Sequence, residues 1–163
     1  MRRSLAALSK RIVKAPARPV HTLNLHATLV FLGQIPAERR ACIESIADAV
    51  QAEPFDVDID YLDYWFRPRI LWCGPRHSPS PLLQLVEDLE AGLEACGHQA
   101  EHRPYRMHVT LARKARPLRA QTINPVISWR VDEFVLAASQ PVQQPPRYEI
   151  LKRWTLGRHD AAG

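Results

Sequence analysis

Two short stretches of this sequence each place a histidine two residues before a threonine. Residues 23–33 read LNLHATLVFLG, with His26 and Thr28, and residues 108–113 read HVTLAR, with His108 and Thr110. Alternate side chains of a β-strand point to the same face, so each stretch is predicted to present an imidazole beside a hydroxyl. An unperturbed imidazole titrates near neutral pH and can either accept or donate a proton there. Two such strands facing each other would bring together a general acid and a general base.

Phosphodiester hydrolysis without a metal is the chemistry that this combination suits. One neutral histidine would take a proton from water, while the second, protonated, would give one to the leaving oxygen. Threonine hydroxyls would bind the non-bridging phosphate oxygens, and an arginine would neutralise the charge that develops at phosphorus. Cationic side chains cluster around the second motif, between residues 101 and 120: Arg103, Arg106, Arg113, Lys114, Arg116 and Arg119.

Spacing alone leaves several roles open for the two motifs. With seven histidines and five threonines in the chain, random placement predicts roughly 0.2 such pairs, so two exceed chance without excluding it. Both histidines could instead be hydrogen-bonded core residues. A zinc site is disfavoured because each motif supplies one good ligand and zinc takes three or four. Nucleophilic catalysis is disfavoured because no serine or cysteine lies in a G-x-S-x-G setting.

The hydrophobic pattern predicts an α+β fold in which a helix precedes each histidine strand. Apolar residues at spacings of three and four predict helices at 4–14, 37–52 and 81–97, the last with Ser80 as its N-cap, and a weaker helix at 116–123. Alternating or continuous apolar runs predict strands at 23–33, 55–61, 69–74, 107–113, 129–138 and 147–156. The repeated order suggests two small antiparallel sheets that face each other across a groove, with helices on the outside.

Composition places few further limits on function. A chain of 163 residues is most simply one domain, and its net charge of +5 favours anionic partners. No apolar run is long enough to span a membrane, and the basic N-terminus lacks the features of a signal peptide, so a cytoplasmic location is expected. Cys42, Cys73 and Cys96 lie far apart in apolar contexts and are predicted to be buried thiols, not a disulfide framework or a metal site. No cofactor is expected.

The paired motifs resemble a known family. LHATLVFLG and YRMHVTLAR are similar to the two signature repeats of the two-histidine phosphoesterases, and most similar to those of the bacterial RNA 2′,3′-cyclic phosphodiesterases, first called 2′-5′ RNA ligases. The stretches RPRILWCGP (67–75) and YEILKRWTL (148–156) resemble the middle and closing strands of the same group. The resemblance runs from about residue 5 to about residue 156.

The resemblance implies a two-lobed fold that hydrolyses terminal 2′,3′-cyclic phosphates of RNA or nucleotides to 2′-phosphates. It makes His26 the general acid on the leaving 3′-oxygen and His108 the general base that orients water. It makes Thr28, Thr110 and Arg113 ligands of the phosphate. The reverse reaction, 2′-5′ ligation of RNA, would use the same groups. No protein partner is implied, and a monomer is expected.

The sequence departs from the family pattern at three places. The short first strand that family members carry before the first helix is not evident, so this strand is expected to be absent. Met107 stands where proline is common. By strict alternation Arg113 lies on the face opposite His108, so its approach to the phosphate requires a twist or bulge at the end of the strand.

Several further residues are weaker candidates for contact with a substrate. Phe31, Tyr105 and Arg106 could contact its base or ribose; Phe31 and Trp72 are also typical of a core. The remaining histidines are expected to be solvated: His21, His77, His98, His102 and His159. Two alternative functions stay open, namely a non-catalytic module that binds RNA ends and an enzyme for a small ADP-ribose-type cyclic phosphate.

Overall fold

The computed structural model describes residues 1–100, 103–140 and 147–157. Its helices are α1 (Arg2–Ile12), η1 (Thr22–Asn24), η2 (Ala37–Arg39), α2 (Arg40–Ala49) and α3 (Ser80–Glu94), where η denotes a 3₁₀-helix. Its strands are β1 (Arg18–Pro19), β2 (Phe55–Trp65), β3 (Ile70–Gly74), β4 (Val109–Arg113), β5 (Gln121–Val131), β6 (Glu133–Gln140) and β7 (Arg147–Thr155). The α+β class and the two antiparallel sheets are confirmed.

The larger sheet has five strands in the order β1-β4-β3-β2-β5, all antiparallel to their neighbours. Strand β2 begins with the alternation FDVDIDY, which buries Phe55, Val57 and Ile59 and exposes Asp56 and Asp58. The predicted strand is therefore confirmed and continues to residue 65. Strand β3 is buried along its whole length, as its continuous apolar run predicted.

The prediction of a weak helix at 116–123 is wrong. Residues from Gln121 onward form β5, whose backbone pairs with β2 from Gln121 opposite Leu62 to Val131 opposite Phe55. Pairing along a whole neighbouring strand outweighs a marginal helical pattern. The strand predicted at 129–138 is in fact two strands that meet near Asp132 and belong to different sheets.

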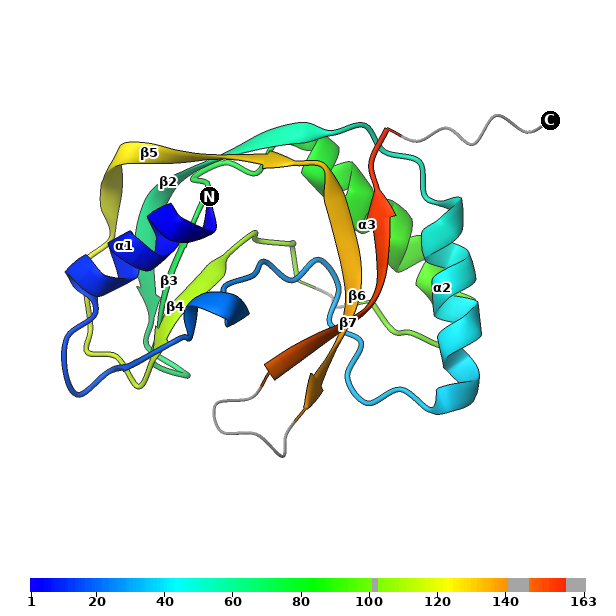
Figure 1. Cartoon of the computed structure of the whole chain (residues 1–163), viewed down its shortest axis with the longest axis horizontal. Helices are drawn as coiled ribbons and strands as arrows, with labels where there is room; N and C mark the ends of the chain where they lie inside the picture. The colour runs from blue at the N-terminus through cyan, green and yellow to red at the C-terminus, as the bar shows by residue number, and fades with distance from the viewer. Residues whose placement is uncertain (101–102, 141–146, 158–163) are drawn as a thin grey trace.

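Strands β6 and β7 form the second sheet, which Figure 1 shows beside α2 and α3. Phe134 and Trp154 stack across it with ring centroids 5.1 Å apart. Asp48 on α2 accepts hydrogen bonds from Trp154 Nε1 at 2.6 Å and from Lys152 Nζ at 3.0 Å. Hydrogen bonds from Lys152 and Trp154 lower the pKa of the Asp48 carboxyl. These contacts hold β7 against α2.

The three predicted helices are confirmed with small changes at their ends. Helix α1 contacts β4 and buries Leu5 and Leu8, whereas α2 contacts both α3 and β7. Helix α3 buries the apolar residues expected at helical spacing: Leu82, Leu85, Val86, Leu89 and Leu93. Its N-cap is Pro79, not Ser80, and no side chain caps it. Within the described ranges, no helix is long and apolar enough to cross a bilayer.

The prediction of a strand at 23–33, the segment that carries the first motif, is wrong. Residues 22–24 form η1, and beyond it only Ala27 makes an isolated antiparallel bridge, to Val109. A regular strand needs a continuous row of backbone partners, which this segment does not have. Figure 1 shows it passing as an irregular chain between the two sheets.

The prediction of three free thiols is wrong for two of them. Cys42 on α2 and Cys96 just after α3 form a disulfide. Their separation of 54 residues follows no recognised cysteine spacing, and only the packing of α2 on α3 brings them together. Cys73 is a free thiol, fully buried as predicted, and burial raises its pKa to about 12.

Candidate active site

His108 lies immediately before β4 and against the end of β3. The close approach depends on Gly74, because a Cβ there would collide with the carbonyl oxygen of Met107 and lie 3.4 Å from the Cα of His108. Met107 is buried, with 2% of its surface exposed, and replaces the proline common in the family without displacing the motif from β4. Packing on both sides therefore fixes the backbone at His108.

Both motif histidines are held by the same local hydrogen bond. Nδ1 of His26 lies 2.7 Å from the carbonyl oxygen of Asn24, and Nδ1 of His108 lies 3.0 Å from that of Arg106. A carbonyl oxygen only accepts, so Nδ1 carries the hydrogen in both rings. In each neutral imidazole the lone pair is then on Nε2, the atom left for proton transfer.

An aromatic ring packs against each motif histidine, and the sequence pattern singled out neither of these aromatics. Tyr148 on β7 lies with its ring centroid 4.6 Å from that of His26, and Trp65 on β2 lies 4.6 Å from that of His108. Trp65 also contacts the buried Trp72 at 5.1 Å. With Nδ1 bonded and one side covered, each imidazole has a fixed orientation. Tyr148, at the start of the strand predicted at 147–156, offered a signal in the sequence, whereas Trp65 lies beyond the strand predicted at 55–61 and offered none.

Burial and nearby positive charge both act on His108. Burial lowers the pKa of His108 below its ordinary value of 6.5, and the hydrogen bond to the Arg106 carbonyl opposes this shift. Positive charge on His26, Arg103 and Arg106 lowers the pKa of His108 further. His26 is therefore within electrostatic reach of His108, and His108 is neutral at physiological pH, the state that a general base requires.

A β-bulge brings Arg113 to the side of the sheet that carries Thr110. Thr110 pairs with Trp72 on β3, whereas Arg113 pairs with Ile70, so three steps on β4 match two on β3. Residues directly opposite each other share a face, and Ile70 and Trp72 are two apart on one strand. Strict alternation had placed Arg113 on the face opposite His108. The bulge supplies the irregularity that its approach to a phosphate requires.

Tyr105 joins the two motif segments. Its hydroxyl donates a hydrogen bond of 3.1 Å to the backbone carbonyl oxygen of Thr28, across 77 residues of sequence. Burial raises the pKa of the Tyr105 phenol, so the hydroxyl keeps its proton and its role as donor. The irregular first segment is thus fixed to the stretch that leads into His108, in addition to the bridge between Ala27 and Val109.

Comparison with known proteins agrees with this geometry. A family model described as the 2′-5′ RNA ligase superfamily matches residues 4–142. The chain belongs to this superfamily. It is 37% identical to the RNA 2′,3′-cyclic phosphodiesterase of Escherichia coli over 142 residues, which cover 85% of this chain and 80% of that protein. It is 30% identical to the enzyme of the same name from Thermus thermophilus over 164 residues, covering 90% and 81% of the two chains.

Solved structures share the fold over nearly the whole chain. The crystal structure of E. coli LigT complexed with 3′-AMP matches with a TM-score of 0.88 at 31% identity, covering 96% of this chain and 91% of that one. E. coli LigT complexed with phosphate matches with a TM-score of 0.85 at 30% identity, covering 96% and 90%. The family resemblance of the two motifs is therefore confirmed.

The weaker candidates of this superfamily member lie in different environments. Phe31 is 74% exposed, so it is not a core residue. Trp72 is fully buried beneath the site and does belong to the core. The guanidinium of Arg106 lies over the Trp72 ring, 4.6 Å from its centroid, while the Arg106 carbonyl holds His108. Of these three, Phe31 and Arg106 are exposed enough to touch a substrate.

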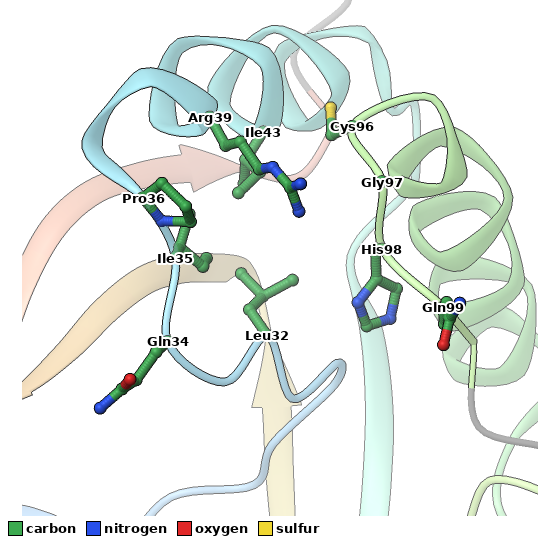
Figure 2. Close-up of a pocket in the computed structure, with 10 residues that line it drawn as sticks. All are labelled: Leu32, Gln34, Ile35, Pro36, Arg39, Ile43, Cys96, Gly97, His98 and Gln99. Carbon is green, nitrogen blue, oxygen red and sulfur yellow. The ribbon is translucent and has the colours of Figure 1, made fainter.

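A pocket of about 210 Å³ lies apart from the motif histidines, between the segment after the first motif and the loop after α3 (Figure 2). Arg39 reaches into it from η2, and His98 stands across from it. His98 is half-buried, and its Nε2 has no hydrogen-bond partner among the described residues, so the expectation of a solvated ring is wrong here. His21 and His77 are exposed as expected, and His102 and His159 lie outside the described residues.

Within the ranges that the structure describes, no group of three or more histidine, cysteine or acidic side chains is placed to hold a metal ion. The candidate site combines two oriented imidazoles with the threonine that follows each of them by two residues. That set can carry out acid–base chemistry at a phosphate.

Proposed function

We propose that this chain hydrolyses 2′,3′-cyclic phosphates at RNA or nucleotide ends to 2′-phosphates. The observation that carries the proposal is the matching orientation of the two motif histidines: each is bonded through Nδ1 to a backbone carbonyl, which leaves Nε2 for catalysis, and the charge of His26 lowers the pKa of His108. Membership of the 2′-5′ RNA ligase superfamily supports the substrate, since the relatives are named for this reaction. E. coli LigT has been crystallised with phosphate and with 3′-AMP, which, like the proposed product, carry a phosphate group.

In the proposed reaction His108 is the general base and His26 the general acid. Nε2 of His108 takes a proton from a water molecule as the water oxygen bonds to phosphorus. The bond from phosphorus to the ribose 3′-oxygen breaks, and Nε2 of His26 gives its proton to that oxygen. The lowered pKa of His108 supports this assignment, because a base must be neutral before the reaction begins. If the 5′-hydroxyl of a second RNA takes the place of water, its oxygen bonds to phosphorus, the bond to the 3′-oxygen breaks as before, and the product is a 2′-5′ phosphodiester, so the same groups would carry out the 2′-5′ ligation.

The remaining site residues would bind the phosphate. Thr28 and Thr110 each follow a motif histidine by two residues, so their hydroxyls can donate to non-bridging oxygens beside the two imidazoles. Arg113, turned to the Thr110 face by the bulge, would stabilise the negative charge that grows during attack. Phe31 and Arg106 are proposed contacts for the base or ribose.

Product analysis tests the reaction directly. An RNA oligonucleotide that ends in a 2′,3′-cyclic phosphate is incubated with the protein in excess EDTA, and phosphorus NMR identifies the product. We expect a 2′-phosphate, because the leaving group is the 3′-oxygen, and an undiminished rate with the chelator. A 3′-phosphate product would contradict the assignment of the leaving oxygen, and an absolute metal requirement would contradict the acid–base mechanism.

Replacing Tyr105 with phenylalanine tests the link between the two motif segments. Loss of the hydroxyl leaves the Thr28 carbonyl without this donor, which we expect to lower the free energy of unfolding by about 1 kcal/mol. Because the first motif is then less well fixed, kcat should fall roughly three- to tenfold while KM changes less. Tyr61→Phe is the matched control, since no hydrogen bond of the Tyr61 hydroxyl occurs among the described residues. Equal effects of the two substitutions on kcat would show that Tyr105 does not position the first motif.

We further propose that residues 1–163 act as one two-lobed domain, as a monomer and without a protein partner. One hydrophobic cluster contains residues of α1, α2 and α3, and both motif histidines come from a single chain. We place the reaction in the cytoplasm, although the Cys42–Cys96 disulfide is more typical of an oxidising compartment. Alkylation of thiols in intact cells before isolation determines the state of Cys42 and Cys96 where the protein acts.

A further inference from the structure

One end of the five-stranded sheet carries a group of exposed cationic side chains, which we call the basic end. It is formed by the turn between β2 and β3, the residues at and after the end of β4, and the start of β1 (Figure 1). Its six cations are all exposed: Arg18, Arg67, Arg69, Arg113, Lys114 and Arg116. None of the six has a salt bridge to any residue in the described part of the chain.

Strand register connects the basic end to the catalytic histidines. Trp65 pairs with Ile70, Ile70 pairs with Arg113, and Arg113 pairs with Arg18. Residues directly opposite each other in a sheet point to the same side, so this row shares one face. Trp65 contacts the His108 ring on that face, with centroids 4.6 Å apart. Arg113 and Arg18 therefore lie on the face of the sheet where Trp65 contacts His108, and the row runs from Trp65 on β2 to Arg18 on the edge strand β1.

The other cations are held beside this row by backbone contacts. The amide of Ala115 donates to the carbonyl of Arg69 at 3.1 Å, and Arg69 Nε donates to the carbonyl of Ala115 at 3.3 Å. The β2–β3 turn with Arg67 is thus fixed next to Lys114 and Arg116. Like charges repel, so such a group is unfavourable without a counter-charge and attracts a polyanion.

An exposed aromatic ring lies within the same turn. Phe66 is 73% exposed, and its ring edge packs on Tyr64 with centroids 5.2 Å apart. A large apolar ring so exposed is not part of the hydrophobic core. Proteins bind single-stranded RNA with aromatic rings beside cations, because bases stack on the rings and phosphates pair with the cations. The opposite end of β2 instead carries Asp56 and Asp58, bonded to Arg130 and Ser128. The arginine at that opposite end is therefore neutralised by a carboxylate, whereas none of the six cations of the basic end has such a partner among the described residues.

We infer that the basic end binds the RNA strand on the 5′ side of the terminal nucleotide, which makes the chain an enzyme for oligonucleotides in preference to mononucleotides. This inference rests on the proposed function, since it assumes that the cyclic phosphate lies at His26 and His108. Phosphates upstream of the terminal one pair with Arg67, Lys114 and Arg116, and a base stacks on Phe66. The small ADP-ribose-type substrate left open by the sequence has no chain to occupy this surface.

The experiment compares two substrates in parallel: a 2′,3′-cyclic mononucleotide and a ten-residue RNA with the same cyclic end. For the wild-type protein we expect a kcat/KM for the oligonucleotide that is at least tenfold higher at low salt. It should fall with salt with a log–log slope of about −3, if about four phosphates are neutralised. The double variant Arg67→Glu/Arg116→Glu should lose this tenfold advantage and most of the slope. Its kcat/KM for the mononucleotide should stay within twofold of wild type.

Controls separate local from general effects of charge. Arg130→Glu/Arg153→Glu changes the net charge equally, at two exposed arginines that are paired with Asp56 and Glu133 away from the basic end. It should retain the oligonucleotide advantage. Phe66→Ala should lower kcat/KM about fivefold for the oligonucleotide alone. An unchanged advantage in the Arg67/Arg116 variant, or an equal loss on both substrates, overturns the inference.

Fluorescence anisotropy with a non-hydrolysable RNA of the same length measures RNA binding by the basic end independently of catalysis. If the wild-type protein hydrolyses neither substrate, the proposed function fails. The RNA-binding role of the basic end is then tested by this measurement alone. At least tenfold weaker binding by the Arg67/Arg116 variant supports that role, and binding equal to that of the wild type contradicts it.

Discussion

Replacing His108 with asparagine is expected to lower kcat for hydrolysis of a 2′,3′-cyclic phosphate by roughly 10²- to 10⁴-fold, the usual contribution of a positioned acid or base. The amide nitrogen of asparagine can occupy the position of Nδ1 and keep the hydrogen bond to the Arg106 carbonyl, which now measures 3.0 Å. It offers nothing at the position of Nε2. The variant therefore removes the base while leaving the local anchor in place, and the same design applies to His26 and the Asn24 carbonyl.

Single-turnover rates with a cyclic mononucleotide measure the chemical step in each variant. His77→Asn is the matched control, because His77 is exposed and lies outside both motifs, and it should leave the rate unchanged. Circular dichroism and thermal unfolding establish that each variant is folded. A His26→Asn or His108→Asn protein that is folded and keeps more than a tenth of the wild-type rate contradicts the acid–base pair.

The pH dependence of the same variants distinguishes the two roles. A base works only when neutral, so the wild-type rate falls as pH decreases through the pKa of His108, which lies below the ordinary 6.5. This acidic limb should disappear in His108→Asn. In His26→Asn the basic limb should disappear, and the acidic limb should move to higher pH, since removing the positive charge of His26 raises the pKa of His108. The opposite pattern would show that His26 is the base and His108 the acid.

Local pattern was enough to predict the elements whose side chains alternate or repeat without interruption. Strand β2 was evident from its alternating apolar and acidic residues, and α3 from leucines between Pro81 and Gly97. The second motif is of this kind too, because Val109 and Leu111 are buried on a real strand while Thr110 faces the other way. The motifs themselves led to the superfamily that the family model and the relatives confirm.

Features that depend on long-range packing were not predictable from the same patterns. The first motif has the composition of a strand, yet only Ala27 finds a backbone partner. Residues 121–131 have a poor strand pattern and are paired because β2 extends beside them. Trp65 and Tyr148 gain their importance only from the histidines that they contact in space. One inserted residue in β4 reverses the face of everything after it, which alternation alone cannot anticipate.

Removing the Cys42–Cys96 disulfide should have the largest effect on stability. In the chain-entropy description, a bridge that closes a loop of 54 residues stabilises the folded state by about 4 kcal/mol. Cys42→Ser should therefore lower the free energy of unfolding by this amount and Tm by roughly 10 °C. Activity at 25 °C should change little, because neither cysteine contacts a motif histidine. Denaturant titration with and without reductant measures the difference, and reductant should have no further effect on the variant.

Thiol counting makes the same test quantitative. Denatured wild-type protein should react at one thiol without reductant, the free Cys73, and at all three cysteines with it. In the native protein Cys73 should be inert, because it is fully buried and burial raises its pKa to about 12. Cys73→Ala is the control, since it removes a thiol and leaves the bridge. Three reactive thiols without reductant, or equal midpoints for wild type and Cys42→Ser, would show that α2 and α3 are held by packing alone.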